Sequence, residues 1–295
     1  MRLVTYEAQG TWRSGILRGE AVVDAESAAK QARSGGAERV WVSNRAIIQA
    51  SEAERAAALE AAAELESSAI PLADVRLGPP IPDPEKILCM GLNYRDHAAE
   101  SNLPLPEVPL FFAKFRNSLV GPADQIALPG ASDQIDYEAE LAVVMGRRCR
   151  DVAVTDALGY VAGAMALNDV SARDLQMEAS QWTMGKAIDT FAPCGPALVL
   201  MDEIADLQSL GIRARVNGET LQDANTSLMV FGVAEAIAFL TRVMTLEPGD
   251  IIATGTPAGV GMARDPKVWL RDGDVVEIEI DEIGTLRNPV IGPSA

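Results

Sequence analysis

The chain has 295 residues, of which 48% are hydrophobic and 23% charged, a composition typical of a folded protein with a sizeable core. Asp and Glu number 42 against 25 Lys and Arg, which gives a formal charge of −17. Nucleic acid and anionic membranes are bound mainly through basic side chains, so this balance argues against both partners. An anionic substrate would need a local positive centre, which a bound cation supplies.

The cysteines and the first residues bear on the compartment. Cys89, Cys149 and Cys194 lack the spacing of a metal or redox motif, and their odd number favours reduced thiols. The start, MRLVTYEAQG, has the pattern of neither a signal peptide nor a transit peptide. No run of 18 apolar residues occurs, so no membrane span is predicted. We expect a cytoplasmic protein.

The first 75 residues have the pattern of a small separate unit. Short strands are predicted at 2–7, 14–18 and 20–23. Ser51 and Glu54 have the spacing of a capping box, and an Ala-rich helix is expected from there to residue 66. The proline-rich stretch 77–84 that follows cannot continue regular structure. We therefore predict a small N-terminal α+β domain, 1–75, and a larger domain, 76–295.

The larger domain is richer in predicted strands. Asn217-Gly218 is a strong hairpin signal after a strand. Three prolines indicate an extended surface loop over 101–110. A short helix is expected over 172–179, and a longer one over 229–245 after a Thr226–Ser227 cap. Strands are predicted at 87–90, 138–145, 161–167, 212–216, 250–254 and 275–280. Many short strands without regular βαβ alternation predict a mainly β fold with accessory helices (α+β), with an antiparallel or mixed sheet.

The segment DYEAELAVV, residues 136–144, carries the first candidate site. In a strand, residues i and i+2 point to the same face, so Glu138 and Glu140 would lie together, and Asp136 could join them. The apolar residues that follow place this strand in the core, where adjacent carboxylates repel each other and are costly to desolvate. A hard cation with oxygen ligands would compensate. The alternative is an edge strand whose acidic face lies in water.

The segment LNDVSARDLQ, residues 167–176, carries the second. Asp169 follows an apolar run, and Arg173 and Gln176 lie four and seven positions further on, on one face of a helix that begins after it. An acid, a guanidinium and an amide on one face suit a metal site beside a carboxylate-binding site. The alternative is an N-cap Asp169 with an exposed ion pair to Arg173.

His97 is the sole histidine. Glu100 lies three positions further on, so the two side chains would adjoin on a helical turn. A histidine oriented by a carboxylate is the usual form of a general base near neutral pH. One histidine with scattered cysteines makes a zinc cluster hard to build. The alternative is a surface histidine on a loop.

Two further segments carry polar groups suited to an anionic substrate. Lys186, in WTMGKAIDTF, could place an ammonium near it, or could be a solvated lysine. The glycine-rich turn 253–261 lacks the spacing of a phosphate-binding loop. It could present the Thr256 hydroxyl and backbone N–H groups to a carboxylate, or could be a tight connection between strands.

The order of these motifs over about 85–291 resembles the fumarylacetoacetate hydrolase family, in particular bacterial acylpyruvase-like and fumarylpyruvate hydrolase-like members. The segments that carry the resemblance are GLNYRDHAAE, FFAKFRNSLVGP, DYEAELAVVMG, NDVSARDLQ, WTMGKAIDTFAPCGP, VNGETLQ, LEPGDIIATGTPAGVG and GDVVEIEIDEIGTLRNPV. The resemblance implies a mixed β-sandwich roll, a small N-terminal domain and a homodimer.

The resemblance also implies roles for individual residues. It implies Mg²⁺ or Mn²⁺, with Ca²⁺ in some members, held by Glu138, Glu140 and Asp169. It implies a water activated by His97 and Glu100, and a lid that closes over the substrate. It assigns substrate contacts to Tyr94, Arg173, Gln176, Lys186 and Thr256.

Three functions follow. The first is hydrolysis of a C–C bond in a small 2-oxo or 1,3-dicarbonyl acid, through an enolate stabilised by the cation, with Lys186 and the Thr256 loop stabilising the oxyanion. The second uses the same enolate chemistry to decarboxylate or tautomerise a 2-oxo acid of the oxaloacetate or 2-hydroxyhepta-2,4-dienedioate type, or to dehydrate a sugar acid. The third is a metal-binding protein without turnover, against which the His97–Glu100 pair speaks.

Overall fold

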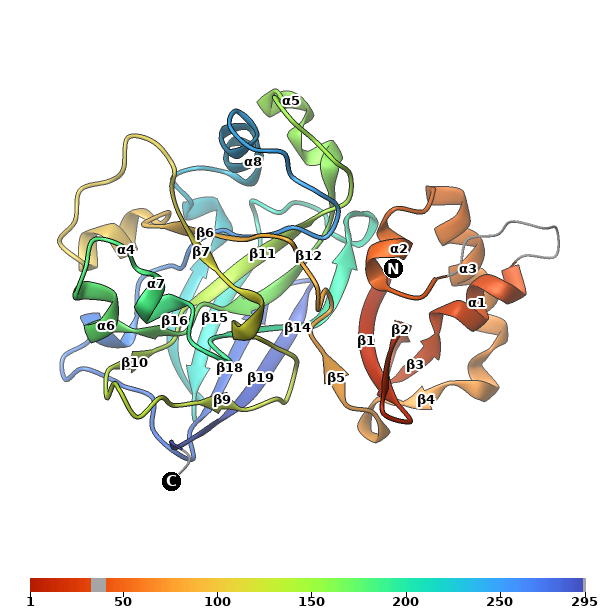
Figure 1. Cartoon of the computed structure of the whole chain (residues 1–295), viewed down its shortest axis with the longest axis horizontal. Helices are drawn as coiled ribbons and strands as arrows, with labels where there is room; N and C mark the ends of the chain where they lie inside the picture. The colour runs from red at the N-terminus through yellow and green to blue at the C-terminus, as the bar shows by residue number, and fades with distance from the viewer. Residues whose placement is uncertain (33–40, 294–295) are drawn as a thin grey trace.

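The computed structural model describes residues 1–32 and 41–293, so residues 294–295 at the end of the predicted larger domain lie outside it. In this part of the chain, most strands belong to a large mixed sheet in the order β4-β3-β2-β1-β14-β12-β11-β17-β6-β7, which begins with the short strand β4 (Ile70–Pro71). A five-stranded sheet, β16-β15-β18-β19-β9, packs against it (Figure 1). The predicted mainly β fold with accessory helices, arranged as a mixed β-sandwich roll, is confirmed.

The N-terminal unit is an antiparallel meander covered by helices. Its strands are β1 (Arg2–Ala8), β2 (Thr11–Arg18) and β3 (Ala21–Asp24), close to the predicted ranges. Its helices are α1 (Ala25–Ala32), α2 (Asn44–Ile48) and α3 (Glu52–Glu64). The predicted capping box is present, because Ser51 and Glu54 bond each other's backbone N–H groups. Helices α1 and α2 were not predicted.

The N-terminal unit is joined to the rest of the molecule by backbone pairing. Strand β1 runs antiparallel to β14 (Ala192–Leu200), with Leu3 opposite Leu198. It also pairs with β5 (Leu77–Gly78), so part of the proline-rich stretch is strand. One hydrophobic cluster continues from the N-terminal helices into the large sheet. The predicted boundary after residue 75 stays a prediction.

The central strands of the large sheet position the carboxylates. Strand β11 (Ala139–Met145) lies between β12 (Val161–Asn168) and β17 (Ile251–Ala253), and every one of its residues is buried. Strand β17 runs parallel to β6 (Ile87–Gly91), which pairs with β7 (Leu110–Lys114). Because β11 is interior, the alternative of an edge strand with its acidic face in water is wrong.

The second sheet confirms two sequence signals. Strands β15 (Gly211–Val216) and β16 (Glu219–Asn225) form a hairpin around Asn217-Gly218, both with positive φ, at 52° and 83°. Strand β18 (Val275–Ile280) alternates buried and partly buried residues. Strands β19 (Gly284–Ile291) and β9 (Ile126–Ala127) complete the sheet. Its inner face and β11 and β12 share the main core.

The helix predicted over 229–245 is shorter in the structure. Helix α8 spans Val233–Thr241 and begins after Gly232. Thr226 starts a 3₁₀ turn, Thr226–Leu228, which Asn225 caps. Residues 229–231 are drawn out of the helix because they bond the segment around Tyr94: Met229 forms a β-bridge with Tyr94, and the Val230 N–H donates to the carbonyl of Asn93.

Candidate active site

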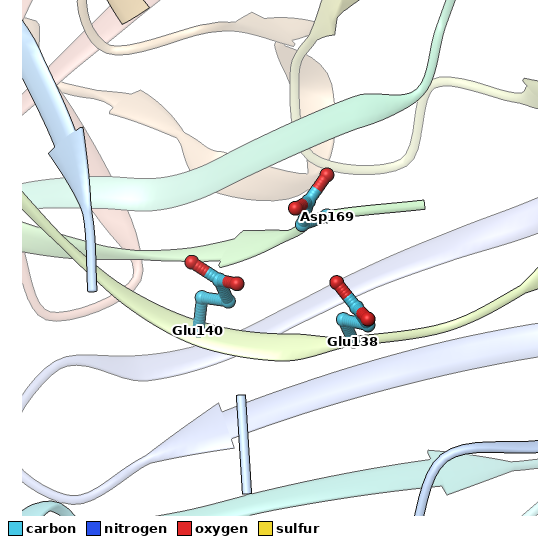
Figure 2. Close-up of side chains that lie close together, drawn as sticks. All are labelled: Glu138, Glu140 and Asp169. Carbon is cyan, nitrogen blue, oxygen red and sulfur yellow. The ribbon is translucent and has the colours of Figure 1, made fainter. Parts of the chain in front are cut away.

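Glu138, Glu140 and Asp169 come together where two paired strands meet (Figure 2). Glu138 directly precedes β11, Glu140 is its second residue, and Asp169 directly follows β12. The register that places Ala139 opposite Asn168 brings the three carboxylates side by side. One oxygen of each lies within 4.8 Å of the others, and the residues are only 4%, 1% and 0% exposed. The grouping predicted from the sequence is confirmed, although β11 begins one residue after Glu138.

Three cationic side chains neutralise two of these carboxylates. Lys186, in α7 (Thr183–Lys186), donates from Nζ to Glu138 at 2.6 Å and to Asp169 at 2.8 Å. Lys114, at the end of β7, donates to the other oxygen of Asp169 at 2.5 Å. Arg173 pairs with the other oxygen of Glu138 at 2.7 Å. Lys186 is 2% exposed, so the alternative of a solvated lysine is wrong.

Glu140 has no basic partner among the described residues. One of its oxygens accepts the N–H of Gly255 at 2.9 Å. Burial, reinforced by the charges of Asp169 and Glu138, raises its pKa well above the usual range. Burial acts on Glu138 in the same direction, but Arg173 and Lys186 outweigh it and hold that pKa below the usual range. Within the described part of the chain, the triad therefore contains one carboxyl group, that of Glu140, without a directly paired basic side chain.

The triad fits a divalent cation. With its four carboxyl groups ionised, the buried cluster would carry one excess negative charge over its three cationic groups. Its members are Asp136, Glu138, Glu140, Asp169, Lys114, Arg173 and Lys186. Carboxylate oxygens are the ligands that hard divalent cations take. A cation held by Glu138, Glu140 and Asp169 would turn the excess into one positive charge, which suits an anionic substrate.

Arg173 is fixed by its own set of partners. It begins α6 (Arg173–Met177), donates from Nε to Asp136 at 2.9 Å and from Nη1 to the side-chain oxygen of Gln176 at 3.1 Å. Burial acts to lower the pKa of Arg173, but Glu138 and Asp136 raise it, so the guanidinium stays charged. The cap of α6 is Ala172, so the alternative of an N-cap Asp169 with an exposed ion pair is wrong.

His97 and Glu100 form the predicted pair on α4 (Arg95–Glu100). The His97 Nδ1 lies 2.8 Å from Glu100 Oε1. The other oxygen of Glu100 accepts the N–H of Gly259 at 2.8 Å. His97 is 7% exposed, so it is not a surface histidine. Nδ1 is thus held, and Nε2 is left as the ring nitrogen for chemistry in the cavity that His97 lines.

The glycine-rich turn serves the protein's own carboxylates. Three of its glycine N–H groups each donate to a different functional acid: Gly255 to Glu140, Gly259 to Glu100, and Gly261 to Asp136. These three N–H groups are therefore not available to a substrate carboxylate, and the contact predicted for the rest of the turn stays a prediction. This one short loop instead orients Glu140 of the triad, Glu100 beside His97, and Asp136 beside Arg173.

Thr256 stays available to a ligand. Its Oγ1 accepts a hydrogen bond from Gln222 Nε2 at 2.8 Å, so its own proton remains free to donate. Gln222 is itself held, because Nε2 also donates to the carbonyl of Pro257 and Oε1 accepts the N–H of Ala139. Gln222 thereby connects the loop to β11.

The site opens into a cavity of about 160 Å³. It is lined by seven of the predicted residues: His97, Glu138, Glu140, Arg173, Gln176, Lys186 and Thr256. Asp169 and Glu100 lie behind this lining, bonded to Lys186 and His97. Tyr94 is fully buried in the main core, away from the lining, and its hydroxyl has no hydrogen-bond partner among the described residues. Its predicted substrate contact stays a prediction.

Sequence reasoning missed two residues that support the site. Lys114 closes the apolar strand LFFAK, and a lysine that ends a buried strand is a signal for a buried partner. Gln222 lies on β16 and is 1% exposed. Its role depends on a contact with a loop more than 30 residues further on, for which the sequence pattern has no signal.

The roll and the site define a class: a protein whose buried carboxylate triad could hold a divalent cation and faces a small cavity beside an oriented histidine. The chain belongs to the fumarylacetoacetate hydrolase family, because the family model described as fumarylacetoacetate (FAA) hydrolase C-terminal matches residues 86–291.

Known proteins of the family have several activities. A mitochondrial oxaloacetate tautomerase of Xenopus laevis is 50% identical over 220 residues, 74% of this chain and 69% of that protein. A fumarylacetoacetate hydrolase structure from Exiguobacterium antarcticum has a TM-score of 0.82 at 35% identity and 99% coverage of both chains. A 2-hydroxyhepta-2,4-diene-1,7-dioate isomerase structure from Mycobacterium marinum has a TM-score of 0.77 at 35% identity and 100% coverage of both.

These similarities leave some expectations untested. Among the described residues, no helix is both long and apolar enough to cross a bilayer. The cytoplasmic location, the homodimer and the exclusion of nucleic acid and membrane partners stay predictions.

Proposed function

We propose that this protein is an enzyme that interconverts the keto and enol forms of a small 2-oxo dicarboxylic acid of the oxaloacetate type, with Mg²⁺ or Mn²⁺, and Ca²⁺ as a possible substitute, at the triad. The observation that carries the proposal is the oriented His97 on the same small cavity as Glu138 and Glu140. The names of the similar tautomerase and isomerase support it.

The residues around the cavity divide the work. Arg173, Gln176 and the Thr256 hydroxyl offer charge and hydrogen bonds to a substrate carboxylate. A divalent cation, when bound, supplies Lewis-acid stabilisation of negative charge on the substrate oxygens. His97, held by Glu100, removes a proton from the carbon beside the carbonyl and delivers it to oxygen, so that the reaction moves one proton and breaks no C–C bond.

Lys186 acts as a fixed positive charge in this scheme. Burial acts to lower its pKa, but Asp169 and Glu138 raise it above the usual value. Its ammonium is therefore held in the protonated form and cannot be the base. It stabilises negative charge that develops on the substrate, as predicted for its role in catalysis.

The second candidate is hydrolysis of a C–C bond in an acylpyruvate-like acid. The same His97–Glu100 pair favours it, because an oriented histidine can also deprotonate a water. The similar structure of a fumarylacetoacetate hydrolase supports it as well. Of the two candidates, tautomerisation requires less space in the cavity, because no water has to bind beside the substrate.

The test follows the disappearance of enol-oxaloacetate above the uncatalysed rate, with Mg²⁺, Mn²⁺ or EDTA, and cleavage of acetylpyruvate in parallel. His97→Gln is expected to lower kcat for tautomerisation by roughly 10²–10⁴-fold with little change in KM. Glu60→Gln, on the exposed face of α3, is the control and should match the wild type.

Each outcome decides between the readings. An unchanged kcat in His97→Gln would show that His97 is not the general base. Cleavage of acetylpyruvate without tautomerisation establishes the hydrolase instead. Metal binding with neither activity favours a binding protein without turnover.

A further inference from the structure

One wall of the cavity includes a tryptophan, Trp182, that packs on a glycine. A Cβ on Gly91, the last residue of β6, would lie 2.7 Å from the Trp182 ring, so only glycine leaves room for it. Trp182 also meets Phe112 edge to face, with ring centroids 5.3 Å apart. The Trp182 ring thus packs against residues of both β6 and its neighbour β7.

This wall lies close to the charged centre. The Phe112 ring lies 5.0 Å from Lys186 Nζ, which in turn contacts Glu138 and Asp169. Phe112 therefore contacts both Trp182 and the lysine that pairs with the carboxylates. Trp182 is only partly buried, and its side chain lines the cavity.

The wall limits what the cavity admits. At about 160 Å³ the cavity is smaller than the roughly 300–1,000 Å³ of pockets for drug-sized ligands. The lining also includes the apolar side chains of Phe112, Leu103 and Met177. A longer diacid would have to displace the ring, or place its second carboxylate against these apolar groups without a partner.

We infer that Trp182, seated on Gly91, sets the length of the substrate and restricts the site to four-carbon 2-oxo dicarboxylates. The inference rests on the proposed function for its reaction, but the size limit itself follows from the wall. Removing the ring should open the cavity to a seven-carbon diacid.

The experiment compares kcat/KM for enol-oxaloacetate and for 2-hydroxyhepta-2,4-dienedioate. The wild type should prefer the four-carbon acid. In Trp182→Ala the ratio of seven-carbon to four-carbon kcat/KM should rise at least about tenfold, the scale on which apolar pockets discriminate by size. Trp182→Phe should fall between the two.

Trp12 provides a matched control. It is also a tryptophan packed over a glycine, with its ring 3.0 Å from a Cβ on Gly78, but it lies in the N-terminal meander. Trp12→Ala should leave the ratio at the wild-type value. Circular dichroism and the thermal shift caused by Mn²⁺ establish that each variant is folded and holds its carboxylate site.

A binding readout separates this inference from the proposed function. The thermal shifts caused by succinate and by heptanedioate, measured with Mn²⁺ present, report length selection without turnover. Heptanedioate should stabilise Trp182→Ala but not the wild type. If the wild type turns over neither acid, the proposed function fails, and the binding data alone decide the inference. Equal responses of wild type and Trp182→Ala, in turnover or in binding, would overturn it.

Discussion

Glu140→Gln should stabilise the metal-free protein, although it removes a residue from the centre of the site. Glu140 is buried beside two other carboxylates and has no basic partner among the described residues. Glutamine keeps the shape and can still accept the Gly255 N–H. Relieving a poorly paired buried group is worth on the order of 1–3 kcal/mol. For a chain of 295 residues that corresponds to a rise in Tm of about 2–5 °C.

Glu138→Gln is the contrasting variant at the same site. Its carboxylate pairs with Arg173 and Lys186, at 2.7 and 2.6 Å. Removing this charge leaves two buried cations underpaired and should lower the free energy of unfolding by about 3–5 kcal/mol. The two substitutions are chemically identical and lie two residues apart. Opposite changes in the free energy of unfolding would therefore report the different charge balance around Glu138 and Glu140.

The pH dependence has a definite sign. The folded protein raises the pKa of Glu140, so it retains a proton that the unfolded chain releases. The stability of the metal-free wild type therefore falls as pH rises from the ordinary glutamate range toward the raised value. Glu140→Gln has no carboxyl group to titrate at this position, so its stability should not fall in this way. The difference in free energy of unfolding between Glu140→Gln and the wild type should therefore grow as pH rises through this range. Divalent cations must displace the proton, so their affinity for the wild type should rise over the same window.

The assay is thermal and urea unfolding at several pH values, in EDTA and in Mg²⁺ or Mn²⁺. At a cation concentration 100 times Kd the wild type should gain about 2.7 kcal/mol. Glu140→Gln should gain much less and should lose turnover. A lower Tm for Glu140→Gln than for the wild type in EDTA, or equal stabilisation of both by the cation, would refute the reasoning.

Two glycines carry the remaining predictions. Gly185→Ala places a methyl group 2.5 Å from a backbone nitrogen of α6, so helix α7 and its Lys186 should shift. We expect kcat/KM to fall at least about tenfold in a steady-state assay. Gly130→Ala is the control, because its Cβ meets nothing closer than 4.0 Å, and its kcat/KM should equal that of the wild type. Gly259→Ala meets the carbonyl of Leu221 at a φ of +103°, so the N–H that holds the partner of the histidine moves. We expect lower kcat with nearly unchanged cation affinity, measured by turnover and by Mn²⁺ titration; equal losses in both would show a general collapse.

The triad and the histidine pair could be predicted because their signals are local. Glu138 and Glu140 are two positions apart, and His97 and Glu100 are three apart, so short-range geometry places each pair together. The hairpin at 217–218 and the capping box before α3 are equally local. Asp169 directly follows β12, the strand next to β11, and the family resemblance had already grouped it with the two glutamates.

The rest of the site depends on contacts between distant segments. Lys114 reaches Asp169 from the edge strand β7, and Gln222 reaches Thr256 from the second sheet. The glycine N–H groups of the loop could donate to a substrate or to the protein, and only the fold decides which. The helix predicted from 229 failed for the same reason, because the bridge between Met229 and Tyr94 outweighs helical periodicity.

The pairing of β1 with β14 argues against trimming the chain to the part that matches the family, residues 86–291. The family match begins at residue 86, which invites a truncated version. Cutting there would strip β14 of its neighbour along Leu198 and Val199 and would uncover the apolar face shared with the N-terminal helices. An unprotected, apolar sheet edge is a template for other chains. By pairing with β14, the N-terminal meander therefore covers an edge through which the sheet that carries the carboxylates could otherwise self-associate.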